Sequence, residues 1–198
     1  GGCEVSGIAR TMAVFGGSRL GNDPSEQQDA GQGGKVLAGG DIRLVEGGGA
    51  NGLMGIEAGS VIRAEGEVTG VIPEFLTKRE KMHECVSELI VTTSMHERKQ
   101  IMFARAEAFW ILPGGFGTFD EMMEILTWRQ LERHNKPIIL VNTAGWGEAV
   151  VAMLEAAVKQ GFASEQSRAL LQVVPDVETA LACSVWQEQG APVPMDTL

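Results

Sequence analysis

The chain has no tyrosine, only three cysteines and no cluster of basic residues. Cys3, Cys85 and Cys183 are widely spaced and odd in number, so the sequence predicts reduced thiols in a cytoplasmic protein and no disulfide framework. No apolar run reaches the roughly 18 residues of a membrane-spanning helix. Residues 1–4 lack the basic and apolar regions of a signal peptide. We therefore expect no membrane partner.

Positive charge is also scarce. The chain has 16 Lys and Arg against 26 Asp and Glu, which gives a formal net charge of −10. Proteins that bind nucleic acids or anionic membranes present basic surfaces to the phosphates, so the charge argues against both kinds of partner. A small anionic ligand is still compatible with this charge, because backbone N–H groups can bind it locally.

Glycine is abundant, with 26 among 198 residues, and short apolar runs alternate with longer amphipathic stretches. Strands are expected at 11–15, 42–45, 68–72, 88–91, 108–112, 137–141 and 170–174. Helices are expected at 24–37, 52–64, 94–106, 118–133, 147–159 and 176–186. This alternation predicts an α/β fold, Rossmann-like and doubly wound, with a mainly parallel sheet covered by helices on both faces. We expect one domain over 11–188, after an N-terminal extension over 1–10 and before a loose tail over 189–198.

Three glycine-rich turns follow predicted strands, at 16–21, 47–49 and 114–117. The carboxyl ends of parallel strands share one edge of the sheet, and ligands bind there where the strand order reverses. The third turn leads into a helix predicted to begin at Thr118, whose unpaired N–H groups could hold a phosphate. Taken alone, this turn fits a phosphate site and a plain tight turn equally well, but three such turns favour a ligand. No Lys-Ser/Thr pair follows the glycines, so this is not a Walker A loop, and we expect a single phosphate.

Glu121 has two interpretations. Thr118 and Glu121 fit a T-x-x-E capping box, in which the carboxylate only satisfies a backbone donor, and the spacing alone favours this one. The alternative is a catalytic carboxylate in the crevice. Arg98 and Lys99 lie in the first turns of the helix predicted from Ser94, where cations oppose the helix dipole. A nearby anion would explain them, and a solvated face is the plainer alternative.

The histidines do not form a metal motif. His83, His96 and His134 contain no H-x-x-x-H pair, and no cluster of cysteine and histidine accompanies them. Ser18 follows a strand but does not stand in a G-x-S-x-G sequence, so no nucleophilic serine is indicated. We expect no metal and no serine triad.

The stretch SMHERKQIMFARAEAFWILPGGFGTFDE, residues 94–121, resembles the LOG family of cytokinin riboside 5′-monophosphate phosphoribohydrolases. The family combines an MHxRK segment with PGGxGTxxE, and both are intact here, at Met95–Lys99 and Pro113–Glu121. The segments VFGGSRLGNDP, GGGANGLMG and GVIPEFLTKRE extend the match to about residues 11–180. The resemblance implies a homodimer that acts on a nucleoside 5′-monophosphate and requires no cofactor.

The resemblance also implies roles for individual residues. Arg98 and Glu121 are the expected catalytic pair, and the glycine loop would hold the 5′-phosphate. Residues expected to bind the substrate and its phosphate are Gly17, Ser18, Gly48, Gly49, Glu80, Met95, Lys99, Gly114, Gly115, Phe116, Gly117, Thr118 and Thr127. The cluster of Met122, Met123, Ile125, Leu126 and Trp128 fits the dimer contact and a core position equally well.

Cleavage of a glycosidic bond passes through a cation-like ribosyl centre. Glu121 would stabilise this charge and position or deprotonate water, whereas Arg98, which is unsuited to donate a proton, would hold the phosphate or the leaving base. The chain departs from the family at Glu46, where a tyrosine commonly stands, and this puts the preferred base in question.

Two alternatives remain open from the sequence. A broader purine nucleoside 5′-monophosphate nucleosidase would share the site. A non-catalytic nucleotide or molybdenum-cofactor carrier would share the fold, because fold alone does not fix function. Lysine decarboxylase chemistry is not expected, because it normally needs a lysine bound to pyridoxal phosphate, and no lysine here has a convincing setting.

Overall fold

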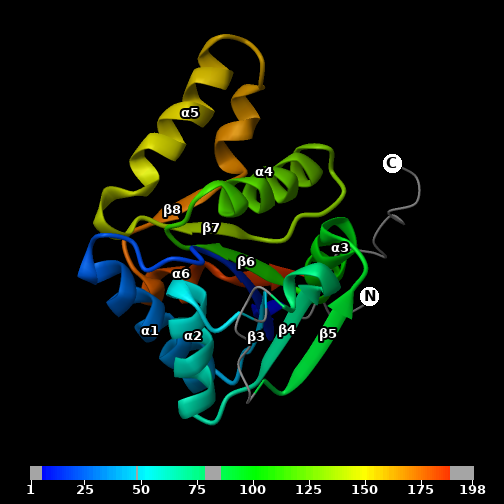
Figure 1. Cartoon of the computed structure of the whole chain (residues 1–198). Helices are drawn as coiled ribbons and strands as arrows, with labels where there is room; N and C mark the ends of the chain where they lie inside the picture. The colour runs from blue at the N-terminus through cyan, green and yellow to red at the C-terminus, as the bar shows by residue number, and fades with distance from the viewer. Residues whose placement is uncertain (1–5, 48, 79–85, 188–198) are drawn as a thin grey trace.

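The computed structural model describes residues 6–47, 49–78 and 86–187 (Figure 1). Its main sheet has seven strands, all paired in parallel, in the order β5-β4-β3-β2-β6-β7-β8. The strands are β2 (Thr11–Phe15), β3 (Arg43–Glu46), β4 (Val68–Pro73), β5 (Glu88–Thr92), β6 (Ala108–Ile111), β7 (Ile138–Val141) and β8 (Gln172–Val174). The doubly wound parallel sheet predicted from the sequence is therefore confirmed.

Helices cover both faces of this sheet (Figure 1). They are α1 (Pro24–Gly39), α2 (Gly52–Arg63), α3 (Met95–Arg105), α4 (Phe116–Gln130), α5 (Gly147–Lys159) and α6 (Val177–Cys183), with short 3₁₀ turns η1 (Glu74–Leu76), η2 (Thr143–Gly145) and η3 (Glu165–Ala169). Within the described ranges, no helix is long and apolar enough to cross a membrane.

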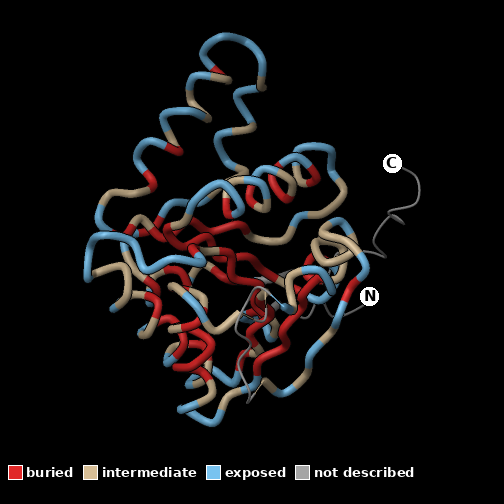
Figure 2. The backbone as a smooth tube through the Cα atoms, viewed as in Figure 1, coloured by how far each residue is buried: buried red, intermediate tan, exposed pale blue. Residues whose placement is uncertain are grey.

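The two faces of the sheet form two hydrophobic cores. Successive residues of a strand point to opposite faces, so in β6 Trp110 packs with α1, α2 and α6, and Phe109 packs with α3, α4 and α5. All four residues of β6 are buried, as expected for a central parallel strand. The buried segments follow the strands and the inner sides of the helices (Figure 2).

Glycines are unfavourable inside a helix, but those of α1 have a packing role. A Cβ atom added at Gly34 would lie 2.5 Å from the Glu57 carbonyl oxygen and 2.6 Å from the Ser60 Cβ in α2. The two helices therefore approach each other more closely than larger side chains would allow. The helix still begins as predicted, with Asp23 as N-cap and Pro24 in its first turn.

The C-terminal helix prediction is wrong beyond Cys183. The chain leaves α6 at the buried Ser184, whose hydroxyl accepts the Trp110 indole N–H at 2.9 Å and donates to the Ala180 carbonyl at 2.7 Å. It then forms β9 (Val185–Gln187), which pairs antiparallel with β1 (Ser6–Ile8). Part of the expected N-terminal extension is therefore a strand, and the expected tail over 189–198 lies outside the described residues.

Glu57 is an unusual core residue. It is fully buried, and neither carboxyl oxygen has a hydrogen-bond partner in the described part of the chain. Burial, together with the charge of Glu46, raises the pKa of Glu57 well above its ordinary value of 4.5. The folded state therefore favours the neutral carboxyl group.

We expect Glu57→Gln to stabilise the protein increasingly as the pH rises. Folding raises the pKa of this acid, so its ionisation lowers the free energy of unfolding above pH 4.5, by up to about 1.4 kcal/mol per pH unit until the folded-state pKa is reached. Glutamine cannot ionise, and the Tm difference between variant and wild type should widen from pH 5 to pH 8 in thermal denaturation. An equal Tm difference at pH 5 and at pH 8 would contradict the conclusion that the buried Glu57 is neutral.

Candidate active site

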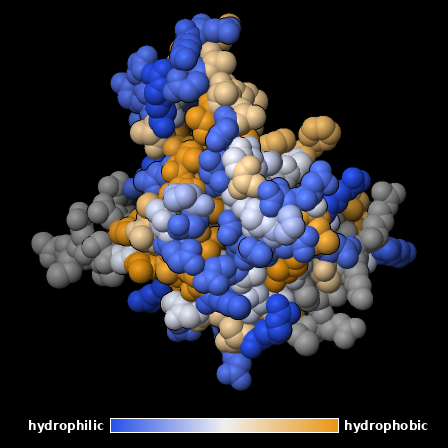
Figure 3. All heavy atoms as spheres, turned by 90° about the vertical axis from the view of Figure 1, so that its left-hand side faces the viewer, coloured by the Kyte–Doolittle hydropathy of each residue, from blue (hydrophilic) through white to orange (hydrophobic). Residues whose placement is uncertain are grey.

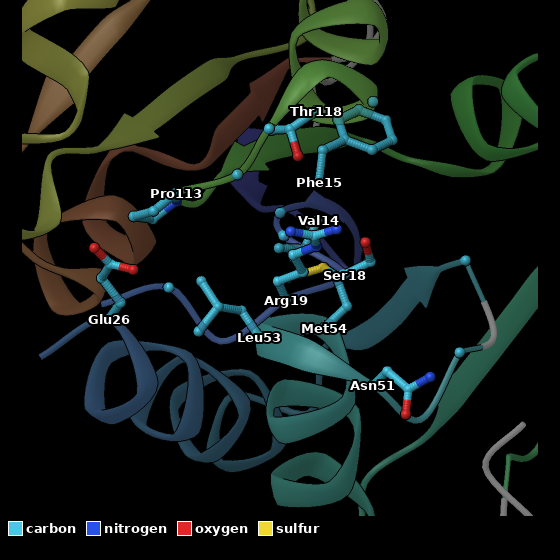
Figure 4. A pocket seen from close by; sticks show the side chains of 18 of the residues that line it. Val14, Phe15, Ser18, Arg19, Glu26, Asn51, Leu53, Met54, Pro113 and Thr118 are labelled. Carbon is cyan, nitrogen blue, oxygen red and sulfur yellow. The ribbon is translucent and has the colours of Figure 1, made fainter. Parts of the chain in front are cut away.

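The candidate site lies at the carboxyl edge of the sheet, between β2 and β6. These strands are neighbours in the sheet but are separated by most of a hundred residues in sequence, so the strand order reverses between them. An open cleft of about 1330 Å³ lies here, lined by the loops after β2, β3, β6 and β7 and by α2 and α3 (Figure 4). The predicted convergence of the three glycine turns is confirmed.

Most of the predicted site residues line this cleft. They are Gly17, Ser18, Gly49, Met95, Arg98, Gly114, Gly115, Phe116, Gly117, Thr118 and Glu121. Gly48 and Glu80 lie outside the described residues. The structure thus brings together segments that are about 100 residues apart in the chain.

Two predicted residues lie away from the cleft lining. The Lys99 amine contacts Asp120 at 3.2 Å and Glu124 at 2.5 Å, and so links α3 to α4. The Thr127 hydroxyl donates to the Met123 carbonyl at 2.7 Å, and the residue borders a second hollow, between α4 and α5. Within one copy of the chain, neither side chain faces the cleft.

The third glycine turn is the start of α4. The helix begins at Phe116, two residues before the predicted start, with Gly115 as an N-cap that makes no side-chain bond. Thr118 therefore lies inside the first turn, and the predicted capping box between Thr118 and Glu121 is wrong. The first bond within the helix runs from the Phe119 N–H to the Gly115 carbonyl, at 3.1 Å.

Two other helices that begin at the cleft, α1 and α2, have first-turn N–H groups that are already bonded. Asp23 caps α1 through the Ser25 N–H at 2.9 Å. In α2, Leu53 and Met54 donate to the Gly17 carbonyl at 3.0 and 3.4 Å. Of these three helices, α4 alone lacks both a side-chain cap and a bond from its first N–H groups to the carbonyl of another loop in the described structure. Its first-turn donors are therefore the ones open to an anion.

Glu121 lies in the cleft wall, one turn into α4, and is partly buried. Burial raises the pKa of its carboxyl group to about 7, although the nearby positive charge of Arg98 acts in the opposite direction. A carboxyl group with this pKa can accept a proton and return it near neutral pH. Asp120, the neighbouring acid, is exposed and contacts Lys99.

Arg98 is held against the turn after β3. Its Nε donates to the Val71 carbonyl at 2.9 Å, and a Cβ atom added at Gly47 would lie 2.2 Å from its Nη2. Gly47 therefore leaves the space that the guanidinium group occupies. Glu97, the nearest acid in sequence, accepts from the Thr93 N–H at 2.7 Å and from its hydroxyl at 2.8 Å.

The start of α3 forms one half of a capping box. The Ser94 hydroxyl accepts from the Glu97 N–H at 3.1 Å. The return bond of Glu97 goes to Thr93 and not to Ser94. The helix start at Met95 is therefore capped, and this fixes the turn that carries Arg98.

Several cleft residues were not singled out from the sequence. Arg19 stands in the middle of the cleft, between Leu53 and Met54 on one side and Thr118 on the other (Figure 4). Glu26 lies at one end, near Pro113. Leu76, Ala144 and Trp146 complete the lining, and no local motif marked them because they come from loops that only the fold brings together.

The described histidines do not form a metal site. His134 is packed against Phe103 and Phe109, and its Nε2 lies 2.9 Å from the Ile125 carbonyl. Burial lowers its pKa to about 4. No group of three or more acidic, histidine or cysteine side chains in the described ranges could hold a metal ion. His83, Cys3 and Cys85 lie outside these ranges.

Known proteins resemble this chain over most of its length. The family model described as "Possible lysine decarboxylase" matches residues 54–183. The chain is 38% identical, over 178 residues, to the cytokinin riboside 5′-monophosphate phosphoribohydrolase LOG2 of Arabidopsis thaliana, covering 90% of this chain and 84% of that protein. It is 42% identical, over 162 residues, to a probable enzyme of the same name, LOG4, from Oryza sativa subsp. japonica, covering 82% of this chain and 70% of the relative.

Solved structures share the fold at lower identity. The molybdenum cofactor binding protein from the phototrophic bacterium Rippkaea orientalis aligns with a TM-score of 0.67 and 21% identity, covering 87% of this chain and 93% of that one. DNA processing protein A from Helicobacter pylori aligns with a TM-score of 0.58 and 14% identity, covering 88% of this chain and 80% of that one. At these identities the similarity shows the fold alone.

Proposed function

Because this chain belongs to the LOG family of cytokinin riboside 5′-monophosphate phosphoribohydrolases, we propose that it hydrolyses the N-glycosidic bond of an adenosine 5′-monophosphate. The products are the free base and ribose 5-phosphate. The observation that carries this proposal is the position of Glu121 in the same cleft as Arg98 and the uncapped start of α4. A carboxyl group, a cation and a set of phosphate-binding donors then face one substrate.

The phosphate defines the orientation of the substrate. The first-turn N–H groups of α4 and its positive dipole end bind the 5′-phosphate. Arg19, in the middle of the cleft, adds a second positive charge to that of Arg98. The ribose then lies toward Glu121, and the base lies toward Met95 and Arg98. This order places the glycosidic bond beside the carboxyl group.

The proposed reaction breaks the bond between C1′ and the base nitrogen, whose electron pair leaves with the base and then binds a proton from the solvent, while Glu121 later returns the proton of the attacking water to the solvent. The Glu121 carboxylate stabilises the positive charge that develops on the ribosyl centre and takes a proton from the water that attacks C1′. Arg98 stays protonated and stabilises negative charge on the leaving base or on the phosphate. These steps use only side chains of this chain and water.

The preferred base is tested by competition. AMP and its N6-isopentenyl derivative, mixed in equal amounts, should both release base together with one equivalent of ribose 5-phosphate, and the faster release identifies the natural base. The same nucleosides without phosphate should react much more slowly, because they lack the group that α4 binds. Equal rates with and without phosphate would refute the proposed phosphate site.

We also propose a cytoplasmic homodimer. Of the five residues that fitted a dimer contact or a core position, Met122, Ile125, Leu126 and Trp128 are in the core. Met123 is exposed and borders the second hollow, of about 370 Å³, together with Thr127 and the exposed Phe162. The segment formed by α5 and η3 projects at the top of Figure 3, where its tip is covered by polar residues. Apolar residues gather below this tip (Figure 3). Analytical ultracentrifugation measures the mass of the protein in solution, and the proposal predicts the mass of two chains.

The acidic end of the cleft should exclude a second phosphate. Asp23 and Glu26 line the end beyond Pro113, and burial and the charge of Asp23 raise the pKa of Glu26. We expect the double variant Asp23→Ser, Glu26→Gln to bind ADP at least about fivefold more tightly, with AMP unchanged, because two like charges are removed. Serine keeps the helix cap.

Inhibition of AMP hydrolysis by ADP measures this effect. The control is Glu155→Gln with Glu165→Gln, which changes the net charge equally at the Arg168 ion pairs of α5 and η3. If both double variants change the ADP affinity to the same extent, overall charge explains the result and the acidic end does not.

A further inference from the structure

Trp146 contacts the proposed phosphate loop on both sides of its open donors. The residue follows η2 and precedes α5, and its indole N–H donates to the Gly114 carbonyl at 3.2 Å. Its ring also stacks on Phe119, with the ring centres 5.7 Å apart and the planes inclined by only 5°. The uncapped first turn of α4 lies between Gly114 and Phe119.

The loop itself has little local packing to fix its shape. A Cβ atom added at Gly115 or Gly117 would meet no other atom within 4 Å, so both glycines are in open space. Glycine backbones retain more conformational freedom than other residues. The direction of the N–H groups at 116–118 therefore depends on the first turn of α4 and on the contacts at the two ends of the loop.

One end is fixed from two directions. The Gly17 N–H donates to the Pro113 carbonyl at 2.8 Å, on the β2 side. At Gly114, an added Cβ atom would lie 2.0 Å from the Thr118 Oγ1, so the loop is folded tightly back on its own helix. Trp146 supplies the hydrogen bond from the β7 side, and its stacking on Phe119 fixes the other end.

The segment that carries Trp146 is held in a defined shape. Ala144 and Gly145 both have positive φ, 53° and 74°, in a tight turn. The Asn142 side chain accepts the Gly147 N–H at 2.8 Å, and the Thr143 hydroxyl donates to Asp29 of α1. A side chain on such a turn is a rigid support, because its own backbone has few alternative conformations.

We propose that Trp146 is a positioning residue that holds the Gly114–Thr118 loop in the shape that binds the 5′-phosphate. The assignment rests on the proposed function, because it takes the phosphate to bind at this loop. Trp146 acts through Gly114 and Phe119 and leaves the chemical step to Glu121. Donors that are already oriented bind an anion without the cost of ordering the loop.

The test compares Trp146→Phe with Trp146→Leu. Phenylalanine keeps an aromatic ring next to Phe119 but lacks the N–H for Gly114, whereas leucine loses both contacts. Calorimetry with ribose 5-phosphate should show about fivefold weaker binding for Trp146→Phe, the effect of one typical hydrogen bond. Trp146→Leu should weaken it further. Adenine binding should stay within twofold of the wild type, and in AMP hydrolysis KM should rise while kcat stays nearly constant.

Trp128→Phe is the matched control, because it removes an indole group from the core behind α4. It should leave ribose 5-phosphate binding unchanged. Unchanged binding by Trp146→Phe, or equal weakening for ribose 5-phosphate and adenine, would overturn the assignment, and this holds even if Trp146→Leu does not fold. Calorimetry needs no turnover, so a wild type that binds ribose 5-phosphate but cleaves no AMP refutes only the proposed reaction.

Discussion

Replacing Glu121 by glutamine is expected to slow base release from AMP by at least about 100-fold, with AMP still bound. Glutamine fits the same space but can neither accept the proton from water nor stabilise a ribosyl cation by its charge, and such catalysis contributes roughly 10²–10⁴-fold. The measurement is kcat from the rate of adenine release, together with AMP affinity by calorimetry. Asp120→Asn is the control, since it removes the neighbouring exposed carboxylate.

The pH profile of the wild type tests the same assignment. The pKa of Glu121 is raised to about 7, so the carboxylate form that acts as a base is scarce below pH 7 and dominant above it. We therefore expect kcat/KM to rise with pH through about 7. A Glu121→Gln variant with a normal rate, or a flat profile in the wild type between pH 6 and 8, would contradict the role of Glu121 as base.

Replacing Gly47 by alanine is expected to reduce kcat by at least about tenfold and to change Tm by no more than a few degrees. The added Cβ atom would lie 2.2 Å from the Arg98 Nη2, and the end of a flexible side chain can move away at little cost. The guanidinium group would then leave the position in which it faces the substrate. A displacement of about 1 Å at such a group can cost roughly 100-fold in rate.

Gly39→Ala is the matched control, because a Cβ atom added there meets nothing within 4 Å. It should leave both kcat and Tm unchanged. A Gly47→Ala variant with a normal rate would show that the position of Arg98 is not important for the reaction. A large fall in Tm would show instead that the turn after β3 depends on Gly47 for folding.

The regular elements of this fold were predictable because each depends on local patterns. The fully apolar run at β6 and the Asp-Pro start of α1 carry their own signals, and α5 was predicted with its observed bounds of Gly147 and Lys159. The glycines of α1 were misleading, because the close contact with α2 that explains them is a tertiary feature.

The errors arose where distant contacts override a local pattern. The spacing of Thr118 and Glu121 fits a capping box, but Gly17 and Trp146 hold the preceding loop so that the helix begins at Phe116. The last helix ends early because Ser184 bonds to Trp110 of the central strand. Neither partner is visible from the local sequence.

The sequence predicted the cleft residues that belong to recognisable motifs. Arg98 and Glu121 share one cleft, as the resemblance implied, whereas Lys99 and Thr127 lie outside its lining in a single copy of the chain. Trp146 was missed because it lies in a connection without a phosphate motif and reaches the loop only through the order of β6 and β7 in the sheet. Residues that support the glycine loop from other parts of the fold can therefore be identified only in the structure.

The most direct test of the central claim is a single-turnover incubation of AMP with excess protein, followed by quantification of adenine and ribose 5-phosphate. We predict that both products appear in equal amounts and that the AMP is consumed. If the AMP is bound but recovered intact, the cleft holds a nucleotide without cleaving it, and the protein would be a carrier on the same fold.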